Sequence, residues 1–472
     1  MTKRLLTTFT IAGACVAAMG QQTPPILPRT AETPKLTPLE LPGMPAKNQI
    51  IANAPLTAAE AVRIAVAHQP LVAIAKAAAD ASHGLMLQTQ ALLGPTVSAT
   101  ASRTEGNIFK QGSQSQSSGG QGSGGQGSGG QGQGSSSDTE TQVALSQLIF
   151  DFNRTRDMVR QSQAVERAGY RTYDQTLQDV ALLAKQDFYA YDQAMQQSKV
   201  QEANVQSRQA QVDLTQAQVN AGTGEPVDLV NAKTLAAQGT IAWSQALQAE
   251  QVAKVKLATD LGIDPRTPIV MAPSAESDVT LPPDLNSLVD EGLKHRPVVL
   301  SAIESLRAAG YGVSVARKNN LPSINFGAGF STSGVTNPFD SQEGFINLTL
   351  NWTLIDSGVT LGKVRQAQAE KTSAAETLRQ ASLGVIQDVS NAVVAVQAAR
   401  QQLPVADAEV TDAQEGVRIA LGSYKAGVTT FQTVITAQGA LVQAQTDKVN
   451  ATAALATALS TLDHAIGKWP LN

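Results

Sequence analysis

Two stretches of sequence decide the fold: DFNRTRDMVRQSQA at residues 151–164 and DSGVTLGKVRQAQA at residues 356–369. They share Asp, Val, Arg, two Gln and Ala at matching positions, and the members of each matched pair are 205 residues apart. The same spacing joins the Ala-Gly pair at 221–222 to the Ala-Gly pair at 426–427. A constant offset between several anchors indicates an internal duplication.

Nearer the N-terminus the offset between the two copies is larger. The motif HQP at 68–70 recurs as HRP at 295–297, which is 227 residues later. The first copy therefore carries 22 additional residues. A tract rich in Gly, Ser and Gln (119–137) accounts for them, and such a composition cannot pack a core. An insertion of this size is tolerated in an exposed loop, and we predict such a loop at 112–137.

Segments in which apolar and polar residues alternate precede the long duplicated stretches. In the second copy, one face carries Phe326, Leu348 and Trp352, whereas the other carries Ser, Thr, Asn and Gly. Segments of about ten residues with this period are typical of outer-membrane barrel strands. A half-buried hairpin in a soluble sheet shows the same pattern, so the pattern alone leaves both interpretations open. Strands are predicted at about 96–102, 141–150, 323–332 and 345–354.

Very long helices are predicted next, at about 152–220 and 357–425. Val205, Val212 and Val219 lie seven residues apart, as in the seam of a coiled coil. A helix of this length would be a rod of about 100 Å. The helices before and after it are shorter in each copy, so the simplest packing places one long helix beside two short helices in tandem.

The N-terminus has the layout of an export signal, because Lys3 and Arg4 precede a short apolar run. The run AGAC ending at Cys15 resembles a lipobox that lacks its leucine, which makes Cys15 a candidate lipidation site. The simpler interpretation is a cysteine that is removed with the signal. The chain is thus predicted to comprise a signal peptide (1–20), a Pro-rich tail (21–55), a first repeat (56–265), a linker (266–283) and a second repeat (284–470).

Composition excludes several classes of protein. A net charge of −4 argues against a nucleic-acid-binding protein, which usually shows a basic excess. A single cysteine excludes an intramolecular disulfide and a cysteine-cluster metal site. The sequence shows no nucleophile–base arrangement, no phosphate-binding glycine loop and no paired carboxylates, and His68 and His295 lack further ligands at metal-binding spacing. We therefore expect no enzymatic activity, no cofactor and no metal.

Four strands in one chain cannot close a barrel. An open sheet edge in lipid leaves backbone groups unpaired, at several kcal/mol each. If the strands lie in a membrane, more than one chain has to contribute to the same barrel.

The order of the motifs resembles that of the TolC-like outer-membrane efflux proteins. The motifs are PLTAAEAVRIAVAHQPLVAIAKAAADAS from residue 55, a strand led by proline, SQLIFDFNRTR from 146, NAGTGEPVDLVNAK from 220 and LATDLGI from 257, followed by a second version of each. The resemblance covers about residues 56–470. It implies a mainly α chain with a transmembrane β-barrel part, in which a homotrimer forms a twelve-stranded barrel continuous with a periplasmic α-helical tunnel.

The resemblance also implies a function, a location and partners. The function is that of a passive exit duct in the outer membrane, with its helices in the periplasm, for a tripartite efflux pump or a type I secretion system. The implied partners are two further copies of the chain, a periplasmic adaptor (membrane fusion) protein, an inner-membrane transporter and outer-membrane lipid. Nothing in the sequence is typical of nucleotide binding, so the energy for transport has to come from the transporter.

In this family the two helix–turn–helix tips carry adaptor contacts and form the periplasmic constriction. The family often shows a D-V-L-x-A stretch after the turn, which the first copy resembles from Asp228 onward. The second copy has no acidic residue there, so an acidic ring is not expected at that tip. For Asp228 itself, the simpler role is an acid that favours a helix N-terminus. By position, the tip residues are Gly222, Thr223, Gly224, Asp228, Asn231, Gly427, Val428, Thr429, Thr430, Thr433 and Thr436.

The main alternative is a structural scaffold or appendage protein, built from coiled coils and β-hairpins and without a role in transport. The duplicated strands with polar faces argue against it, since a fibre needs no lumen. The export duct is therefore the leading hypothesis.

Overall fold

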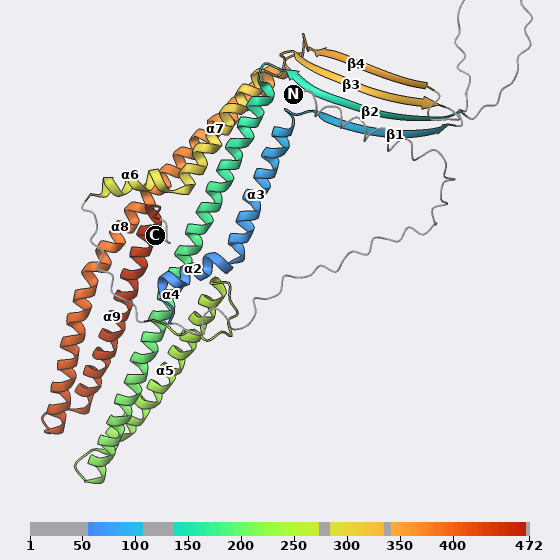
Figure 1. Ribbon diagram of the computed structural model, residues 1–472. Helices are drawn as coiled ribbons and strands as arrows, with labels where there is room; N and C mark the ends of the chain where they lie inside the picture. The colour runs from blue at the N-terminus through green and yellow to red at the C-terminus, as the bar shows by residue number, and fades with distance from the viewer. Residues whose placement is uncertain (1–54, 107–135, 273–283, 335–340, 469–472) are drawn as a thin grey trace, which may run out of the picture. The chain divides into compact units, whose positions relative to one another are not determined.

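The computed structural model describes residues 55–106, 136–272, 284–334 and 341–468. The predicted signal peptide with Cys15, the tail up to residue 54, most of the predicted loop 112–137 and part of the linker lie outside the described residues. The described chain is mostly helical and contains one antiparallel sheet of four strands (Figure 1). This confirms the expected mainly α chain with four strands.

The helices form two sets of matching length. Both α4 and α8 have 67 residues, and both α5 and α9 have 35. Every boundary of α8 and α9 lies 205 residues beyond the corresponding boundary of α4 and α5, which is the offset of the sequence motifs. The helices are α2 (Ala58–His68), α3 (Pro70–Ala91), α4 (Arg154–Asn220), α5 (Pro226–Asp260), α6 (Leu285–His295), α7 (Pro297–Arg317), α8 (Val359–Lys425) and α9 (Phe431–Ala465).

The strands run in chain order across the sheet, and each pairs antiparallel with the next. Strand β4 ends three residues before the predicted limit, so Trp352 and Leu354 follow it. Its partner β3 begins at Ser323, because the preceding Pro322 has no amide hydrogen to donate to the ladder. The strands are β1 (Thr96–Gly106), β2 (Ser136–Phe150), β3 (Ser323–Gly334) and β4 (Ser341–Asn351).

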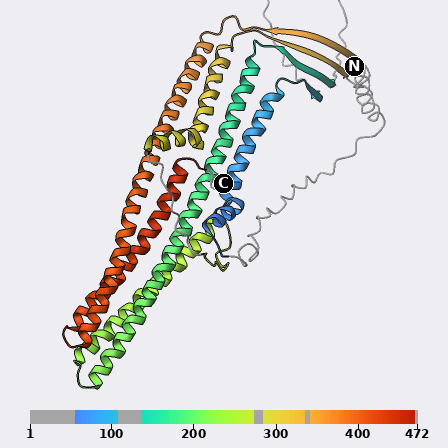
Figure 2. The same cartoon turned by 60° about the vertical axis from the view of Figure 1, so that its left-hand side comes forward.

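The helices lie side by side in a fixed order. In both views α5 runs along α4, and α9 runs along α8 (Figures 1 and 2). Helix α7 contacts both α4 and α8, and α9 also contacts α4. Thus α7 and α9 in tandem join the two long helices, while α3 and α5 in tandem flank α4. This is the arrangement of one long helix beside two short ones that the helix lengths predict.

Two hydrophobic clusters form where the short helices meet. Leu56, Val62 and Leu257 belong to the first cluster, between α2, α4 and α5. Val385 and Leu462 belong to the second, between α6, α8 and α9. We call this region, where the α2–α3 and α6–α7 junctions contact the ends of α5 and α9, the waist.

Sequence reasoning missed the helices α2 and α6. A signal for α2 was present, because Thr57 and Glu60 have the spacing of a capping box. The Thr57 hydroxyl accepts a hydrogen bond from the Glu60 amide, with an O···N distance of 3.2 Å.

The seam of the long helix α4 differs from the predicted one. Val205 and Val212 are only half-buried, whereas Asn204, Gln211 and Thr215 are buried. Thr215 Oγ1 donates a hydrogen bond to the Gln211 carbonyl at 2.8 Å. Asn204 is also bonded within the helix, to Gln201 and Arg208, whereas the buried Gln211 Nε2 has no partner among the described residues. The seam is therefore polar, and the apolar spacing marks a neighbouring position.

By length and composition, α7 is the one described helix that would suffice to cross a membrane. The pair α2–α3 would do so only as a single span bent by 50°. Helix α7 carries Glu304, which pairs with Arg167 of α4 at 2.8 Å.

Candidate functional site: tips, strand faces and waist

The turn between α4 and α5 is the first of the two tips predicted to bind partners. Gly222 has a φ of +73°, the left-handed conformation that ends a helix and favours glycine. The amides of Thr223 and Gly224 both donate to the Gln218 carbonyl at 3.0 Å. A Cβ atom on Gly224 would lie 2.8 Å from the Gln218 Cβ. The tight turn therefore requires glycine at residue 222 for its dihedral angle and at residue 224 for space.

The turn between α8 and α9 is the second tip, and it is built in the same way. Gly427 has a φ of +70°, and the Val428 amide donates to the Ser423 carbonyl at 2.9 Å. The hydroxyl of Thr429 donates to that of Thr433 at 2.8 Å. Val428 itself is 80% exposed, an apolar side chain presented at the turn.

The other predicted tip residues lie at the N-cap or in the first two turns of the returning helices. Thr430 is the N-cap residue of α9, and Thr436 donates to the Gln432 carbonyl within that helix at 3.0 Å. Asn231 is exposed on α5. These residues do not converge on one site, and their contact with partners stays a prediction.

The side chain of Tyr424 joins the two tips. The Tyr424 hydroxyl donates to Gln218 Oε1 at 3.0 Å, and it also lies within hydrogen-bonding reach of Asp228. Burial and the charge of Glu225 raise the pKa of Asp228, and the hydrogen bond with Tyr424 opposes this shift. The buried ring of Phe431 lies 5.8 Å from that of Tyr424. The ends of α4, α5, α8 and α9 are thus tied within one chain.

Sequence reasoning missed Tyr424 as a tip residue, and it gave Phe431, which lies within the predicted second tip, no role of its own. The signal was their position, because the two aromatic residues flank the second turn in a chain with only 4% aromatic residues. Asp228 was identified, but as a residue of the first tip alone. The structure shows that it also faces the second.

The strand register sorts the side chains of the sheet onto two faces. Directly opposed residues such as Ala99 and Val143, Val143 and Phe330, and Ala328 and Ile346 lie on the same face. At the end nearer the helices that face is largely apolar in all four strands, with Gln147 as an exception, and further along it carries Arg103, Thr141 and Thr332. The other face carries mainly small and polar residues, namely Ser98, Thr100, Gln142, Ser146, Asn325, Gly327, Ser331, Asn347 and Thr349, together with the apolar Leu148 and Phe345.

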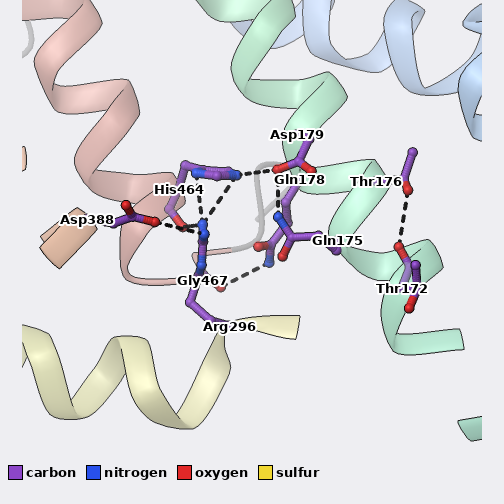
Figure 3. Close-up of polar contacts among 9 residues, drawn as sticks. All are labelled: Thr172, Gln175, Thr176, Gln178, Asp179, Arg296, Asp388, His464 and Gly467. Atoms are coloured by element: carbon purple, nitrogen blue, oxygen red, sulfur yellow. Dashed lines mark hydrogen bonds and ion pairs between the residues drawn. The ribbon is translucent and has the colours of Figure 1, made fainter. Parts of the chain in front are cut away.

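The waist of the second repeat contains a buried arginine. Arg296, between α6 and α7, is 5% exposed. Its Nη1 donates to the His464 carbonyl at 2.8 Å, and its Nη2 pairs with Asp388 at 3.3 Å (Figure 3). His464 Nε2 lies 2.7 Å from Asp179 Oδ1. Burial lowers the pKa of Arg296, while the charges of Asp388 and Asp179 raise it. One side chain thus connects the α6–α7 junction with α8 and α9, and through His464 with α4.

The waist of the first repeat uses different residues at the same place. Gln69 corresponds to Arg296, and its Nε2 donates to the Asp260 carbonyl at 3.2 Å. The Asp260 carboxyl contacts that of Asp187, so the expectation of no paired carboxylates is wrong. The two acids are 73 residues apart in the sequence, and only the pairing of α4 with α5 brings them together.

Two further expectations concern ligands. Among the residues that the structure describes, no group of His, Cys, Asp and Glu is arranged to hold a metal ion. The candidate lipidation site, Cys15, lies outside the described ranges.

The comparisons with known proteins agree with this architecture. The family model for outer membrane efflux proteins matches residues 61–262 and 288–468. The chain is 29% identical over 256 residues to the pyoverdine export outer membrane protein OpmQ of Pseudomonas putida. That alignment covers 53% of each protein, so the chain spans about half the length of this relative.

Solved structures share the fold at low identity. The outer membrane protein VceC of Vibrio cholerae superimposes with a TM-score of 0.71 at 20% identity, over 87% of this chain and 96% of VceC. The CmeC outer membrane channel of Campylobacter jejuni gives 0.72 at 17% identity, over 87% and 85% of the two chains. Since the family model matches most of the sequence, this chain belongs to the outer membrane efflux protein family of TolC-like channels, with its place in the outer membrane and its helices in the periplasm.

Proposed function

We propose that three copies of the chain close a twelve-stranded barrel, which continues into a helical tunnel. The observation that carries this proposal is the sheet, which has one largely apolar face and two open edges. Within the described residues, β1 and β4 each pair on one side only. Lipid contains no water to satisfy such edges, so they have to pair with each other between chains. Twelve lies within the range of even strand numbers in bacterial barrels.

The two faces of the sheet fit this closure. Ile346, Leu348 and Leu350 on β4 are more than 60% exposed in the single chain and suit a lipid-facing surface. The opposite face, with its Ser, Thr, Asn and Gly side chains, suits a water-filled lumen. A lumen of this kind has no use in a structural scaffold, so the sheet favours a duct.

The helices supply the periplasmic half of the duct. In each chain, α3 with α5 and α8 are the outermost members of the row of helices, so α8 of one copy would lie beside α3 and α5 of the next. The tips would dock a periplasmic adaptor, and the adaptor would join the duct to an inner-membrane transporter in a tripartite efflux pump or a type I secretion system. The relative OpmQ is named for pyoverdine export, which supports export as the direction of transport.

Cysteine cross-linking across the open edges tests the closure. One cysteine replaces a β1 residue such as Ala99, and a second replaces a β4 residue such as Ile346. Within one chain these positions are separated by β2 and β3, about 14 Å at the usual strand spacing, which is beyond disulfide reach. We therefore expect disulfides between chains, in a ladder that ends at three chains. Several residue pairs along the two edges should be tried, because disulfide formation depends on the register.

The outcomes separate the hypotheses. A ladder that continues beyond three chains would indicate an open, fibre-like assembly and would contradict the closed barrel. For the transport role, the purified trimer in a planar bilayer is expected to conduct ions. A trimer that forms but conducts nothing, even with the tips removed, would favour the scaffold alternative.

The turns at the tips give a second prediction. Gly222→Val and Gly427→Val are each expected to reduce cross-linking to the adaptor and to reduce export, because a β-branched residue disfavours the positive φ that each turn requires. The strain is at least about 1–2 kcal/mol at each position. Gly422→Ala is the matched control, since Gly422 lies in α8 and a Cβ there meets nothing within 4 Å. Unchanged cross-linking in both valine variants would show that the tips do not take part in docking the adaptor.

A further inference from the structure

A buried carboxylate lies at the waist end of the α4–α5 pair. Asp187 of α4 is only 2% exposed. Its Oδ1 accepts a hydrogen bond from Lys256 of α5. Its Oδ2 is also buried, and no hydrogen-bond donor among the described residues reaches it. A buried acceptor without a donor is strongly unfavourable. This oxygen would therefore be stabilised by a hydrogen-bond donor, and no described donor group supplies one.

The carboxyl of Asp260, at the end of α5, lies next to that of Asp187. It lies within hydrogen-bonding reach of Asp187, and its Oδ2 is 3.9 Å from the ammonium of Lys256. The side chain of Lys256 is largely exposed. One ammonium compensates one carboxylate, and two carboxylates in contact repel each other if both are ionised. A proton on Asp260 would remove the repulsion and would supply the donor that Asp187 Oδ2 lacks.

We propose that Asp187 and Asp260 form a proton-binding site that clamps the end of α5 to α4. The clamp is closed when Asp260 carries a proton that it donates to Asp187, and it loosens when that proton is lost. The Asp260 main chain also accepts the Gln69 hydrogen bond, so the same residue ties α5 to the α2–α3 junction. Release of the carboxyl pair therefore acts at a point where α4, α5 and the α2–α3 junction meet.

The electrostatics of the surroundings support a proton at this site. The hydrogen bond to Asp187, burial and the charge of Asp187 raise the pKa of Asp260 to about 6, while the charge of Lys256 lowers it. An acid whose pKa is higher in the folded state stabilises the fold at low pH. This stabilisation is complete below the unfolded pKa near 4 and is lost as the pH rises through about 6.

The other titratable groups near the clamp are accounted for. On α5, Glu250 faces Tyr191 of α4, one turn beyond Asp187. His68 at the end of α2 is exposed. On α9, Asp463 pairs with Lys185 of α4 at 4.0 Å. None of these groups contributes to the shift of Asp260, which arises from Asp187, Lys256 and burial.

In the second repeat, uncharged residues pack at the positions that correspond to Asp187, Asp260 and Lys256. At the 205-residue offset, Asp187 corresponds to Ala392, Asp260 to Ala465 and Lys256 to Thr461. Both alanines are buried at the same place between α8 and α9, 2% and 1% exposed. A buried ionic group that an apolar pair can replace contributes little to stability. The first repeat therefore retains the acids for a property other than packing, and proton binding is the property that their geometry provides.

Hydrogen–deuterium exchange of the full-length protein in detergent tests the clamp. With intrinsic rates corrected for pH, protection of the segment 250–262 is expected to fall about tenfold between pH 5 and pH 8, given a pKa that rises from 3.8 to about 6. The control is the segment 235–249 of the same helix, which contains no titratable residue and should change little. The measurement needs neither a trimer nor a partner, so its outcome is separate from that of the cross-linking experiment.

Two variants make the test decisive. The double variant Asp187→Ala/Asp260→Ala copies the second repeat. It should fold, and its segment 250–262 should no longer lose protection between pH 5 and pH 8, a loss that we call the pH step. If it fails to fold, Asp260→Asn serves instead, because an amide donates to Asp187 Oδ2 at every pH and should keep the segment protected at pH 8. Loss of the step in either variant supports the clamp. An unchanged step in Asp260→Asn, or the absence of a step in the wild type, would overturn it.

Discussion

Gly262→Ala is expected to lower the unfolding temperature of the detergent-solubilised protein far more than Gly222→Ala does. The two glycines have nearly the same backbone conformation, with φ values of +72° and +73°. They differ in their surroundings. A Cβ on Gly262 would lie 2.6 Å from the His68 carbonyl oxygen and 3.0 Å from the Gln69 amide nitrogen, whereas a Cβ on Gly222 meets nothing within 4 Å.

The expected sizes follow from this difference. Both substitutions carry the left-handed strain of about 1–2 kcal/mol. At Gly262 the methyl group also overlaps backbone atoms that cannot rotate away, and overpacking of this kind adds typically about 1–3 kcal/mol. Gly467, at the equivalent place in the second repeat, has a φ of +73° and would bring a Cβ 2.8 Å from the His295 carbonyl carbon. Gly467→Ala should therefore behave like Gly262→Ala. Equal effects at Gly262 and Gly222 would show that the waist is not tightly packed.

Arg296→Leu is the second substitution with a large expected effect. It removes the donor to the His464 carbonyl and the partner of Asp388 at a junction of several helices. The His464 carbonyl keeps the Gly467 amide as a donor at 3.0 Å, so the loss there is one hydrogen bond to a charged group, typically about 1.5–3 kcal/mol. Part of the ionic contact with Asp388 is lost as well. We expect a clear loss of stability, measured by thermal unfolding, together with faster hydrogen exchange at the end of α9.

Arg296→Gln is the matched control, because glutamine occupies the corresponding position of the first repeat. The first repeat has Gln69 at this place, and its amide donates to the main chain of Asp260 in the same manner. Glutamine at residue 296 should therefore recover most of the stability without restoring the pair with Asp388. If the leucine and glutamine variants lose the same amount, the ionic contact and not the main-chain hydrogen bond holds the waist.

The elements of the fold were largely predictable because their signals are local and repeated. The 205-residue offset of the motifs is also the offset of the helix boundaries, and the alternating segments are strands. The seam of α4 was not predictable from the valines, since Asn204 and Gln211 occupy it. Apolar spacing identifies a helical seam only where the buried positions are apolar.

The contacts at the waist and between the tips were not predictable, for a different reason. Arg296 was part of a recognised motif, but its motif partner is glutamine, and the groups that it contacts lie 92 and 168 residues further along the chain. Asp187 and Asp260 are isolated acids in a helical pattern until α5 folds back onto α4. Tyr424 reaches Asp228 only once α8 lies beside the first tip. Each site depends on how helices pair, which the local sequence pattern does not specify.

The equal lengths of the helices in the two repeats have a consequence for the symmetry of the proposed trimer. Three chains with two matching halves each form a ring of six quasi-equivalent units, which is a pseudo-sixfold tube. The two kinds of waist alternate around it, with carboxyl pairs at three positions and buried arginines at the other three. A change in proton concentration would therefore act on every second unit, so the tube would respond with threefold symmetry.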